Sequence, residues 1–161
     1  MKSNKLIIRT KSKSYPIYFG SNILSKTGIL VSKNLPSVKK IYIISDKNLP
    51  KIFIKTLTKS LKKYKLKSIS LVANEKTKSI KVASKIIEDL LKNNFNRSDC
   101  IIAFGGGIIS DLSAFVSNIT KRGIKFINIP TTLLAQVDAS VGGKTGVNSK
   151  QGKNLIGTFY Q

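Results

Sequence analysis

The sequence contains no histidine, a single cysteine, seven acidic residues and no long hydrophobic run. The lone thiol of Cys100 cannot form an internal disulfide, so we expect a reduced, cytoplasmic setting. No stretch approaches the roughly 18 apolar residues of a membrane-spanning helix, and the apolar run near the N-terminus is too short for a signal peptide. Without histidine, Asp and Glu alone would form a poor zinc site.

The scarcity of acidic residues leaves a strongly basic chain. Lys and Arg number 29 against 7 Asp and Glu, a formal net charge of +22, which would suit a protein that binds nucleic acid or a membrane surface. Only Arg9, Arg97 and Arg122 are arginines, however, and nucleic-acid readers rely on the arginine fork. The lysines are spread along the chain, and their densest pairs, Lys39-Lys40 and Lys62-Lys63, are not interleaved with aromatics. We interpret the charge as compositional drift toward Lys, Ile and Asn that also favours anionic small substrates, and expect no nucleic-acid or membrane partner.

The 161 residues, 41% of them hydrophobic, are enough for one ordinary domain with a core. Short apolar runs at 5–9 and 15–19 predict a hairpin. Beyond it, buried-strand patterns alternate with helical periodicity. The strand segments are 40–45, 66–72, 99–104 and 125–129, and the helical segments are 22–34, 49–63, 77–94 and 108–121. This alternation predicts a Rossmann-like, doubly wound α/β fold: a mostly parallel sheet with helices on both faces.

A glycine loop stands where the third predicted strand of the sheet meets a helix. Gly105-Gly106-Gly107 is followed by Ile108-Ile109-Ser110-Asp111. Bare glycines let a diphosphate approach the backbone closely, and a helix N-terminus offers free N–H groups to it. The spacing is neither a G-x-G-x-x-G fingerprint nor a Walker A loop. The alternative is a tight turn that places Asp111 in the first turn of the helix, where the dipole favours it.

A second polar cluster begins at Pro130-Thr131-Thr132, directly after the last predicted strand. Downstream, Lys144 and Lys153 each follow a glycine, where an ammonium group can reach a bound anion without crowding. Gly142-Gly143-Lys144-Thr145 suggests a P-loop, but Asp138 stands where the first glycine of that motif would lie. A P-loop is therefore rejected.

Together these motifs resemble the 3-dehydroquinate synthase family. The motifs that carry the resemblance are Gly105-Gly106-Gly107-x-x-x-Asp111, Arg122-Gly123, the continuous run from Pro130 to Thr145, and Gly152-Lys153-Asn154-Leu155-Ile156-Gly157. They cover residues 100–161 almost continuously. Related aminocyclitol-forming cyclases share much of this pattern, whereas glycerol-dehydrogenase relatives share the glycine loop but not the run 137–145.

The resemblance implies an enzyme that uses NAD and zinc (or cobalt) to convert DAHP, an anionic sugar acid phosphate, into 3-dehydroquinate and phosphate in the shikimate pathway. It also implies a homodimer. Two alternatives stay open. One is another sugar-phosphate cyclase, similar to 2-deoxy-scyllo-inosose synthase, that acts on glucose 6-phosphate. The other is a non-catalytic basic module that binds nucleic acid.

The resemblance also implies roles for individual residues. The residues expected to bind NAD are Asp46, Asn48, Glu75, Lys78, Gly106, Gly107, Ile108, Ile109, Ser110, Asp111, Thr131, Thr132, Lys144 and Lys153. The residues expected around the substrate are Asp138, Lys144, Lys153, Asn154 and Arg122, of which Arg122 could serve a neighbouring subunit's site. From the sequence alone, Asp46 could equally cap the next helix. Position 110, usually glycine in the family, is Ser110, whose side chain would lie close to the diphosphate.

The chain departs from the family in length and in metal ligands. The family is about twice as long, and its zinc is held by one glutamate and two histidines in a helical second domain. We therefore expect residues 1–161 to be one NAD-binding domain, the last ~20 residues leading toward that helical domain. We also expect no metal ligand in this chain and no turnover by the chain alone.

Overall fold

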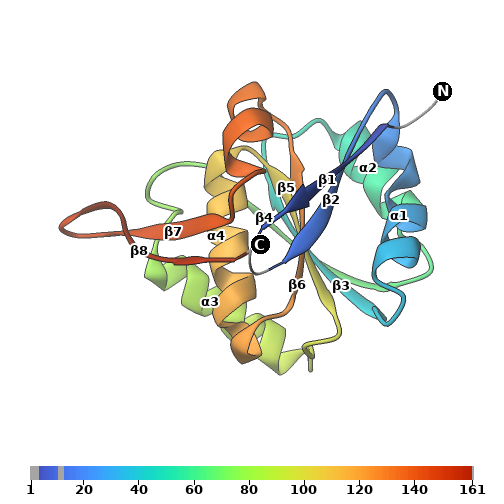
Figure 1. The fold of residues 1–161 in the computed structure, drawn as a ribbon. Coiled ribbons are helices and arrows are strands. Elements are labelled where there is room, and N and C mark those ends of the chain that lie inside the picture. Colours follow the sequence, from blue (N-terminus) through green and yellow to red (C-terminus); the bar gives the residue numbers. More distant parts are fainter. Residues whose placement is uncertain (1–3, 11–12, 161) are drawn as a thin grey trace.

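A parallel four-stranded sheet forms the centre of the computed structural model, which describes residues 4–10 and 13–160. Its strands are β3 (Lys40–Asp46), β4 (Lys65–Leu71), β5 (Cys100–Gly105) and β6 (Lys125–Pro130). They lie in the order β4-β3-β5-β6, and all neighbours pair in parallel (Figure 1). The predicted strands and the parallel sheet are confirmed.

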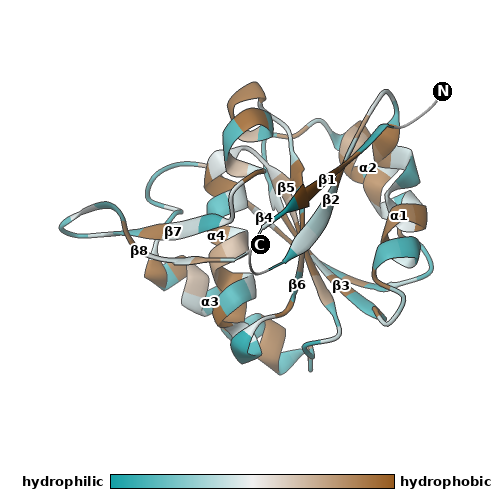
Figure 2. Ribbon diagram, in the orientation of Figure 1, coloured by the Kyte–Doolittle hydropathy of each residue, from teal (hydrophilic) through white to brown (hydrophobic). Residues whose placement is uncertain are grey.

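Helices cover both faces of this sheet. One face carries α1 (Thr27–Asn34), preceded by the 3-10 turn η1 (Ile23–Lys26), together with α2 (Lys51–Ser60). The other carries α3 (Ile80–Lys92) and α4 (Gly107–Ile119), with the 3-10 turn η2 (Thr120–Arg122) after it. Figure 2 shows hydrophobic residues along these helices. Hydrophilic residues lie at outer loops, such as the tip of the hairpin formed by β7 (Lys144–Ser149) and β8 (Gly152–Phe159). The doubly wound architecture is confirmed.

The two faces have separate cores because side chains alternate along each buried strand. Tyr42 and Ile44 of β3 pack in the cluster that includes α3 and α4. Ile41 and Ile43 pack in the cluster that includes α1 and α2. The near-continuous apolar run of β3 is thus explained by burial on both sides.

The N-terminal hairpin consists of β1 (Asn4–Arg9) and β2 (Ser14–Phe19), which pair antiparallel as predicted. It touches the C-terminal part of the chain, where the N–H of Gly142 donates to the Tyr15 hydroxyl at 3.4 Å.

The C-terminal segment forms elements that the sequence patterns did not predict. A short π-helical turn, η3 (Ala135–Ala139), follows β6, and then β7 (Lys144–Ser149) and β8 (Gly152–Phe159) form an antiparallel hairpin. The base of the hairpin crosses α4, and its tip projects from the domain (Figure 1). Val147 of β7 is fully buried in the core beneath it. The hairpin therefore contributes to this domain's core through β7.

Candidate functional site

The candidate site lies at the carboxyl edge of the sheet, beside the point where the strand order reverses. From β3 the chain moves outward to β4, whereas from β5 it moves outward to β6. In open parallel sheets the crevice outside the strands at such a point is the usual ligand site. The loops that begin after Asp46 and Gly105 flank it.

The glycine turn leaves the start of α4 bare. Gly106 is the N-cap residue and provides no side-chain cap, and its carbonyl accepts the Ser110 N–H at 3.0 Å. A Cβ on Gly106 would lie 3.1 Å from the Thr132 methyl, whereas a Cβ on Gly107 would meet no atom within 4 Å. The first-turn N–H groups and the open space at Gly107 form a cradle that an anion can approach.

Helix α4 begins at Gly107, one residue earlier than the sequence pattern indicated. Its first turn contains no acidic residue, and Asp111 lies in the second turn. The alternative that placed Asp111 in the first turn is therefore wrong. The Ile109 side chain is fully buried, and a Cβ on Gly105 would lie 2.8 Å from it. Ile109 can therefore serve a ligand only through its backbone.

The Ser110 hydroxyl faces the protein interior. It donates to Asn128 Oδ1 at 2.9 Å, and the Asn128 amide donates to the Ala139 carbonyl at 3.3 Å. Ser110 is 2% exposed. The hydroxyl therefore ties α4 to β6 and η3, and a contact between the Ser110 side chain and a bound diphosphate stays a prediction.

A buried lysine joins three segments at this edge. Lys78, at 6% exposure, lies just before α3. Its ammonium group donates to Asn154 Oδ1 at 2.5 Å and forms an ion pair with Asp111. A buried cation is tolerated only when such partners replace its water. The contact brings together three residues that the sequence had singled out from distant positions.

Glu75 begins a second set of polar contacts beside this pair. Its carboxylate accepts from the Asn148 amide at 2.7 Å and lies 3.5 Å from the Lys153 ammonium. Asn148 Oδ1 in turn accepts the Asn154 N–H at 3.0 Å. Asn148 was not among the predicted site residues. Its place at the end of the glycine-rich stretch that contains Lys144 is the one signal that could have pointed to it. That signal is weak, because an asparagine there equally suits a turn.

Two carboxylates of the site have shifted pKa values. Burial raises the pKa of Asp111, the Lys78 ammonium opposes this rise, and the charges of Asp138 and Glu75 add to it. The hydrogen bond from Asn148, aided by Lys153, lowers the pKa of Glu75. The exposed Asp138, in η3, therefore lies close enough to act on Asp111 electrostatically.

The remaining NAD-binding candidates lie on loops of the same edge. Asp46 Oδ1 accepts the Asn48 N–H at 3.0 Å in a local turn, and α2 begins later, after Pro50 and without a side-chain cap. The interpretation of Asp46 as a helix cap is therefore wrong. The Thr131 N–H donates to the Gly105 carbonyl at 3.0 Å, which fastens the β6 loop to the glycine turn. Thr132 Oγ1 accepts from the Ala135 N–H at 3.3 Å.

Two predicted substrate residues lie apart from the cluster. Lys144 is exposed at the start of β7. It precedes Asn148 by four residues of the strand, so about 13 Å separates the two positions along the chain. Arg122 follows the far end of α4, whose 13 residues span about 20 Å. The structure therefore does not bring Arg122 to the Lys78–Asp111 pair of its own chain.

Within residues 4–10 and 13–160, no three His, Cys, Asp or Glu side chains gather as a metal site would require. The described acidic residues of the site thus do not form a metal centre. None of the helices in this part of the chain is long and apolar enough to cross a membrane.

Solved structures of related shape show which fold this chain shares. A 2-deoxy-scyllo-inosose synthase, whose structure contains carbaglucose-6-phosphate, NAD+ and Co2+, matches 98% of this chain and 42% of its own with a TM-score of 0.89 at 24% identity. The 2-epi-5-epi-valiolone synthase of Streptomyces hygroscopicus, with NAD+ and Zn2+ bound, matches 96% of this chain and 43% of its own with a TM-score of 0.79 at 22% identity. The chain has the same α/β fold as the matching parts of these two synthases.

Sequence comparison identifies the family within that class. The 3-dehydroquinate synthase N-terminal family matches residues 68–161. The 3-dehydroquinate synthase of Pelagibacter ubique is 49% identical over 98% of this chain and 43% of its own, and that of Bartonella bacilliformis is 40% identical over 100% and 44%. The chain belongs to the 3-dehydroquinate synthase family, and it spans less than half the length of these relatives.

Proposed function

We propose that this chain forms the NAD-binding part of a cytoplasmic 3-dehydroquinate synthase, which converts DAHP into 3-dehydroquinate and phosphate. Residues 1–161 make up one domain in this proposal. One observation carries it: the open glycine cradle lies at the same sheet edge as the Lys78–Asp111–Asn154 cluster. The 49% identical relative of that name supports the choice of reaction.

The cradle fits the diphosphate of NAD. Gly106 and Gly107 contribute no side chain, and the space beside Gly107 is open. The first-turn N–H groups of Gly107, Ile108 and Ile109 would donate to the phosphate oxygens, since a helix N-terminus favours negative charge. When bound, NAD supplies reversible hydride removal from a substrate hydroxyl.

Polar residues around the cradle would position the rest of the cofactor. The Asp111 carboxylate is fixed by Lys78 and keeps a side chain that is 27% exposed, so it can accept hydrogen bonds from ribose hydroxyls. Asp46 and Asn48 would meet the adenosine end from the β3 side. Thr131 and Thr132 would line the side of β6.

Anionic substrate would lie against the lysines. Lys144 and Lys153 are exposed and would pair with its carboxylate and phosphate, while Asp138 would accept from a hydroxyl. Asn154 would orient the substrate from the rim of the Lys78 cluster. Arg122, at the far end of α4, would act in the site of a second subunit of a homodimer.

In this proposal the metal of the complete enzyme would be held by residues of the rest of the enzyme; among residues 4–10 and 13–160, no three His, Cys, Asp or Glu side chains gather. The chain alone is then expected to bind NAD without forming 3-dehydroquinate.

Gly107→Asp and Gly107→Asn test the cradle. Aspartate at the first helical position suits the helix dipole, so Gly107→Asp should fold at least as stably as the parent chain. Its charge should repel the diphosphate. We expect NAD at about 100 times its Kd to stabilise the parent chain by about 2.7 kcal/mol in thermal unfolding. Gly107→Asp should abolish this gain, and the neutral, similarly sized Gly107→Asn should retain part of it. Equal gains in both variants would contradict the proposed cradle.

Experiments can distinguish two alternative functions from this one. The alternative substrate is glucose 6-phosphate, because the 2-deoxy-scyllo-inosose synthase that shares this fold was solved with carbaglucose-6-phosphate bound. Each substrate, added to the complete enzyme with NAD, distinguishes the two cyclases by its product. A non-catalytic module would instead bind nucleic acid with strong salt dependence and gain no stability from NAD.

A further inference from the structure

The two densest lysine pairs of the sequence meet at the edge of the sheet opposite the candidate active site. Lys39-Lys40 begins β3, and Lys62-Lys63 lies just before β4. The two strand starts are adjacent, since the Lys65 N–H donates to the Lys39 carbonyl at 3.1 Å. β3 has seven residues, so about 20 Å separates this edge from the glycine cradle.

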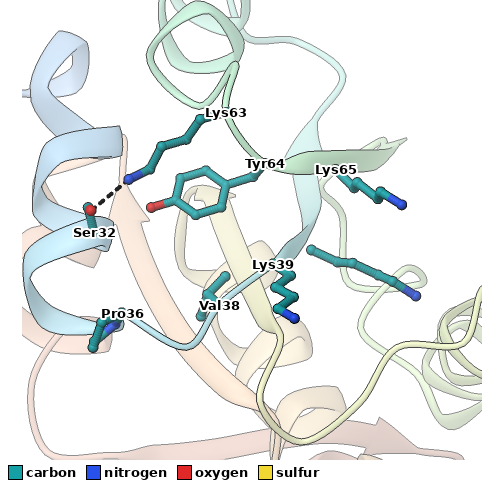
Figure 3. Close-up of a pocket in the computed structure, with 8 residues that line it drawn as sticks. Ser32, Pro36, Val38, Lys39, Lys63, Tyr64 and Lys65 are labelled. Carbon is teal, nitrogen blue, oxygen red and sulfur yellow. Dashed lines mark hydrogen bonds between the residues drawn. The ribbon is translucent and has the colours of Figure 1, made fainter.

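Three of these lysines, Lys39, Lys40 and Lys63, line a pocket of about 420 Å³ (Figure 3), which we name the lysine pocket. Its lining includes Lys39, Lys40, Lys63 and Lys65, with Val38 and Tyr64 as apolar parts. The volume is within the usual range of small-molecule sites. No acidic residue from the described part of the chain lines the pocket.

The positive charge of the lysine pocket is not neutralised by its contacts. Lys63 donates to the Ser32 hydroxyl at 2.6 Å, and Lys40 donates to the Asn93 and Asn94 carbonyls at 3.2 and 2.8 Å. These partners are uncharged. The Asp99 carboxylate accepts the Lys40 N–H at 3.0 Å, but Asp99 is 3% exposed and does not line the pocket.

Lys39 and Lys65 are the ammonium groups left available for a ligand. Both side chains are exposed, and neither ammonium group has a hydrogen-bond or ion-pair partner among the residues that the structure describes. In Figure 3 the Lys63 side chain points toward Ser32, whereas the Lys39 and Lys65 side chains extend away from it in other directions. Like charges repel, so a bound anion between these lysines would lower their electrostatic free energy.

We propose that the lysine pocket binds a small phosphate-bearing anion with two or more negative charges, at a site separate from the candidate active site. Lysine is a common point-charge partner of phosphate. The pocket is concave, partly apolar and without arginine, which favours a small molecule over nucleic acid.

Pyrophosphate and orthophosphate serve as probes, and the amide NMR signals of the chain report where each one binds. The titration is done at about 0.1 M salt, which screens exposed charges more than about 10 Å apart. We expect pyrophosphate to shift the signals of residues 38–40 and 63–65 saturably, and to bind more tightly than orthophosphate. Shifts confined to residues 106–109 would overturn the lysine pocket while leaving the NAD cradle supported.

A matched pair of double variants separates a built pocket from general positive charge. Lys39→Gln/Lys65→Gln should weaken pyrophosphate binding at the pocket by about tenfold or more, equivalent to about 1.4 kcal/mol. Lys55→Gln/Lys85→Gln removes the same charge from exposed positions outside the pocket and should change it less than about twofold. Equal weakening by both pairs, or absence of saturable shifts, would overturn the proposal. Short single-stranded DNA that moves the same signals at lower concentration than pyrophosphate would overturn the assignment to a small anion.

Discussion

Lys78 shows how a charged side chain can be buried at the centre of the candidate site. At 6% exposure it has lost most of its water, and the Asp111 carboxylate and the Asn154 side-chain amide oxygen replace that water. Neither partner alone satisfies the three donors of an ammonium group. The three residues therefore act as a unit that holds α4 and the β7–β8 hairpin together.

Lys78→Met is expected to lower the free energy of unfolding by about 2 kcal/mol. This value is below the usual cost of breaking a buried pair, because the Asp111 side chain is 27% exposed. Asp111→Asn should cost about 1 kcal/mol, and the double variant less than the sum of both. Urea unfolding of all four proteins measures the coupling, and strict additivity would contradict the pairing.

Ser110→Ala tests whether the hydroxyl at this position is structural. Its loss leaves Asn128 Oδ1 without that donor and should cost about 1–2 kcal/mol of stability. The stabilisation by NAD should remain as in the parent chain, because the hydroxyl faces Asn128. Ser113→Ala is the matched control: this buried hydroxyl has no partner among the described residues, so its removal should cost nothing measurable. A reduced response to NAD in Ser110→Ala would contradict the structural role.

At the scale of the elements, close approaches decide which helices can pack. A Cβ on Gly28 of α1 would lie 1.9 Å from the Ser60 carbonyl oxygen at the end of α2. Glycine is unfavourable in a helix, but here it lets the two helices meet.

Gly28→Ala should therefore destabilise the chain by about 2 kcal/mol, although alanine gains about 1 kcal/mol in helix propensity elsewhere. Gly107→Ala, where a Cβ would meet no atom within 4 Å, is the control and should be neutral or stabilising. Chemical denaturation measures both variants. Stabilisation by Gly28→Ala would show that α1 and α2 can separate without cost.

Strand β3 and helix α3 are joined by a charge-assisted hydrogen bond. The Tyr42 hydroxyl donates to Asp89 Oδ2 at 2.6 Å, and the Lys67 ammonium lies 3.0 Å from the same carboxylate. The Tyr42 hydrogen bond, with Lys67 beside it, lowers the pKa of Asp89 below its ordinary value of 3.8. A lowered folded-state pKa stabilises the fold above the unfolded value, and this stability is lost as the pH falls through the folded value.

Asp89→Asn should lower stability by about 1 kcal/mol at neutral pH. The difference between the two proteins should shrink as the pH falls below 3.8, where the wild-type carboxylate becomes protonated. Unfolding free energies measured across that range test this. A difference that stays constant with pH would contradict the ionic contribution.

For the whole molecule, a net charge of +22 means that folding brings many like charges closer together. Salt screens this repulsion. We expect Tm to rise between about 0.02 and 0.2 M sodium chloride, because the Debye length falls from roughly 20 to 7 Å. A falling Tm would mean that specific ion pairs outweigh the general repulsion.

Much of the fold was predictable because its signals are local. Residues 41–44 and 100–104 are apolar at every position, which is typical of a strand buried on both faces. The glycine cradle was predictable for the same reason, since its three glycines stand at the junction of strand and helix. The β7–β8 hairpin was missed because most of β8 is exposed and its sequence has no clear alternation.

The sequence by itself determined the alternation of strands and helices, the position of the glycine turn, the family and the charge of the chain, because periodicity, composition and motifs are properties of neighbouring residues. The tertiary structure alone decided which distant residues meet. It buried Lys78 between Asp111 and Asn154, turned Ser110 inward toward Asn128, and left Arg122 at the far end of its helix. These outcomes depend on how elements pack in space, because the packing energy of a side chain is set by neighbours that are distant in the chain, as Lys78 and Asn154 are.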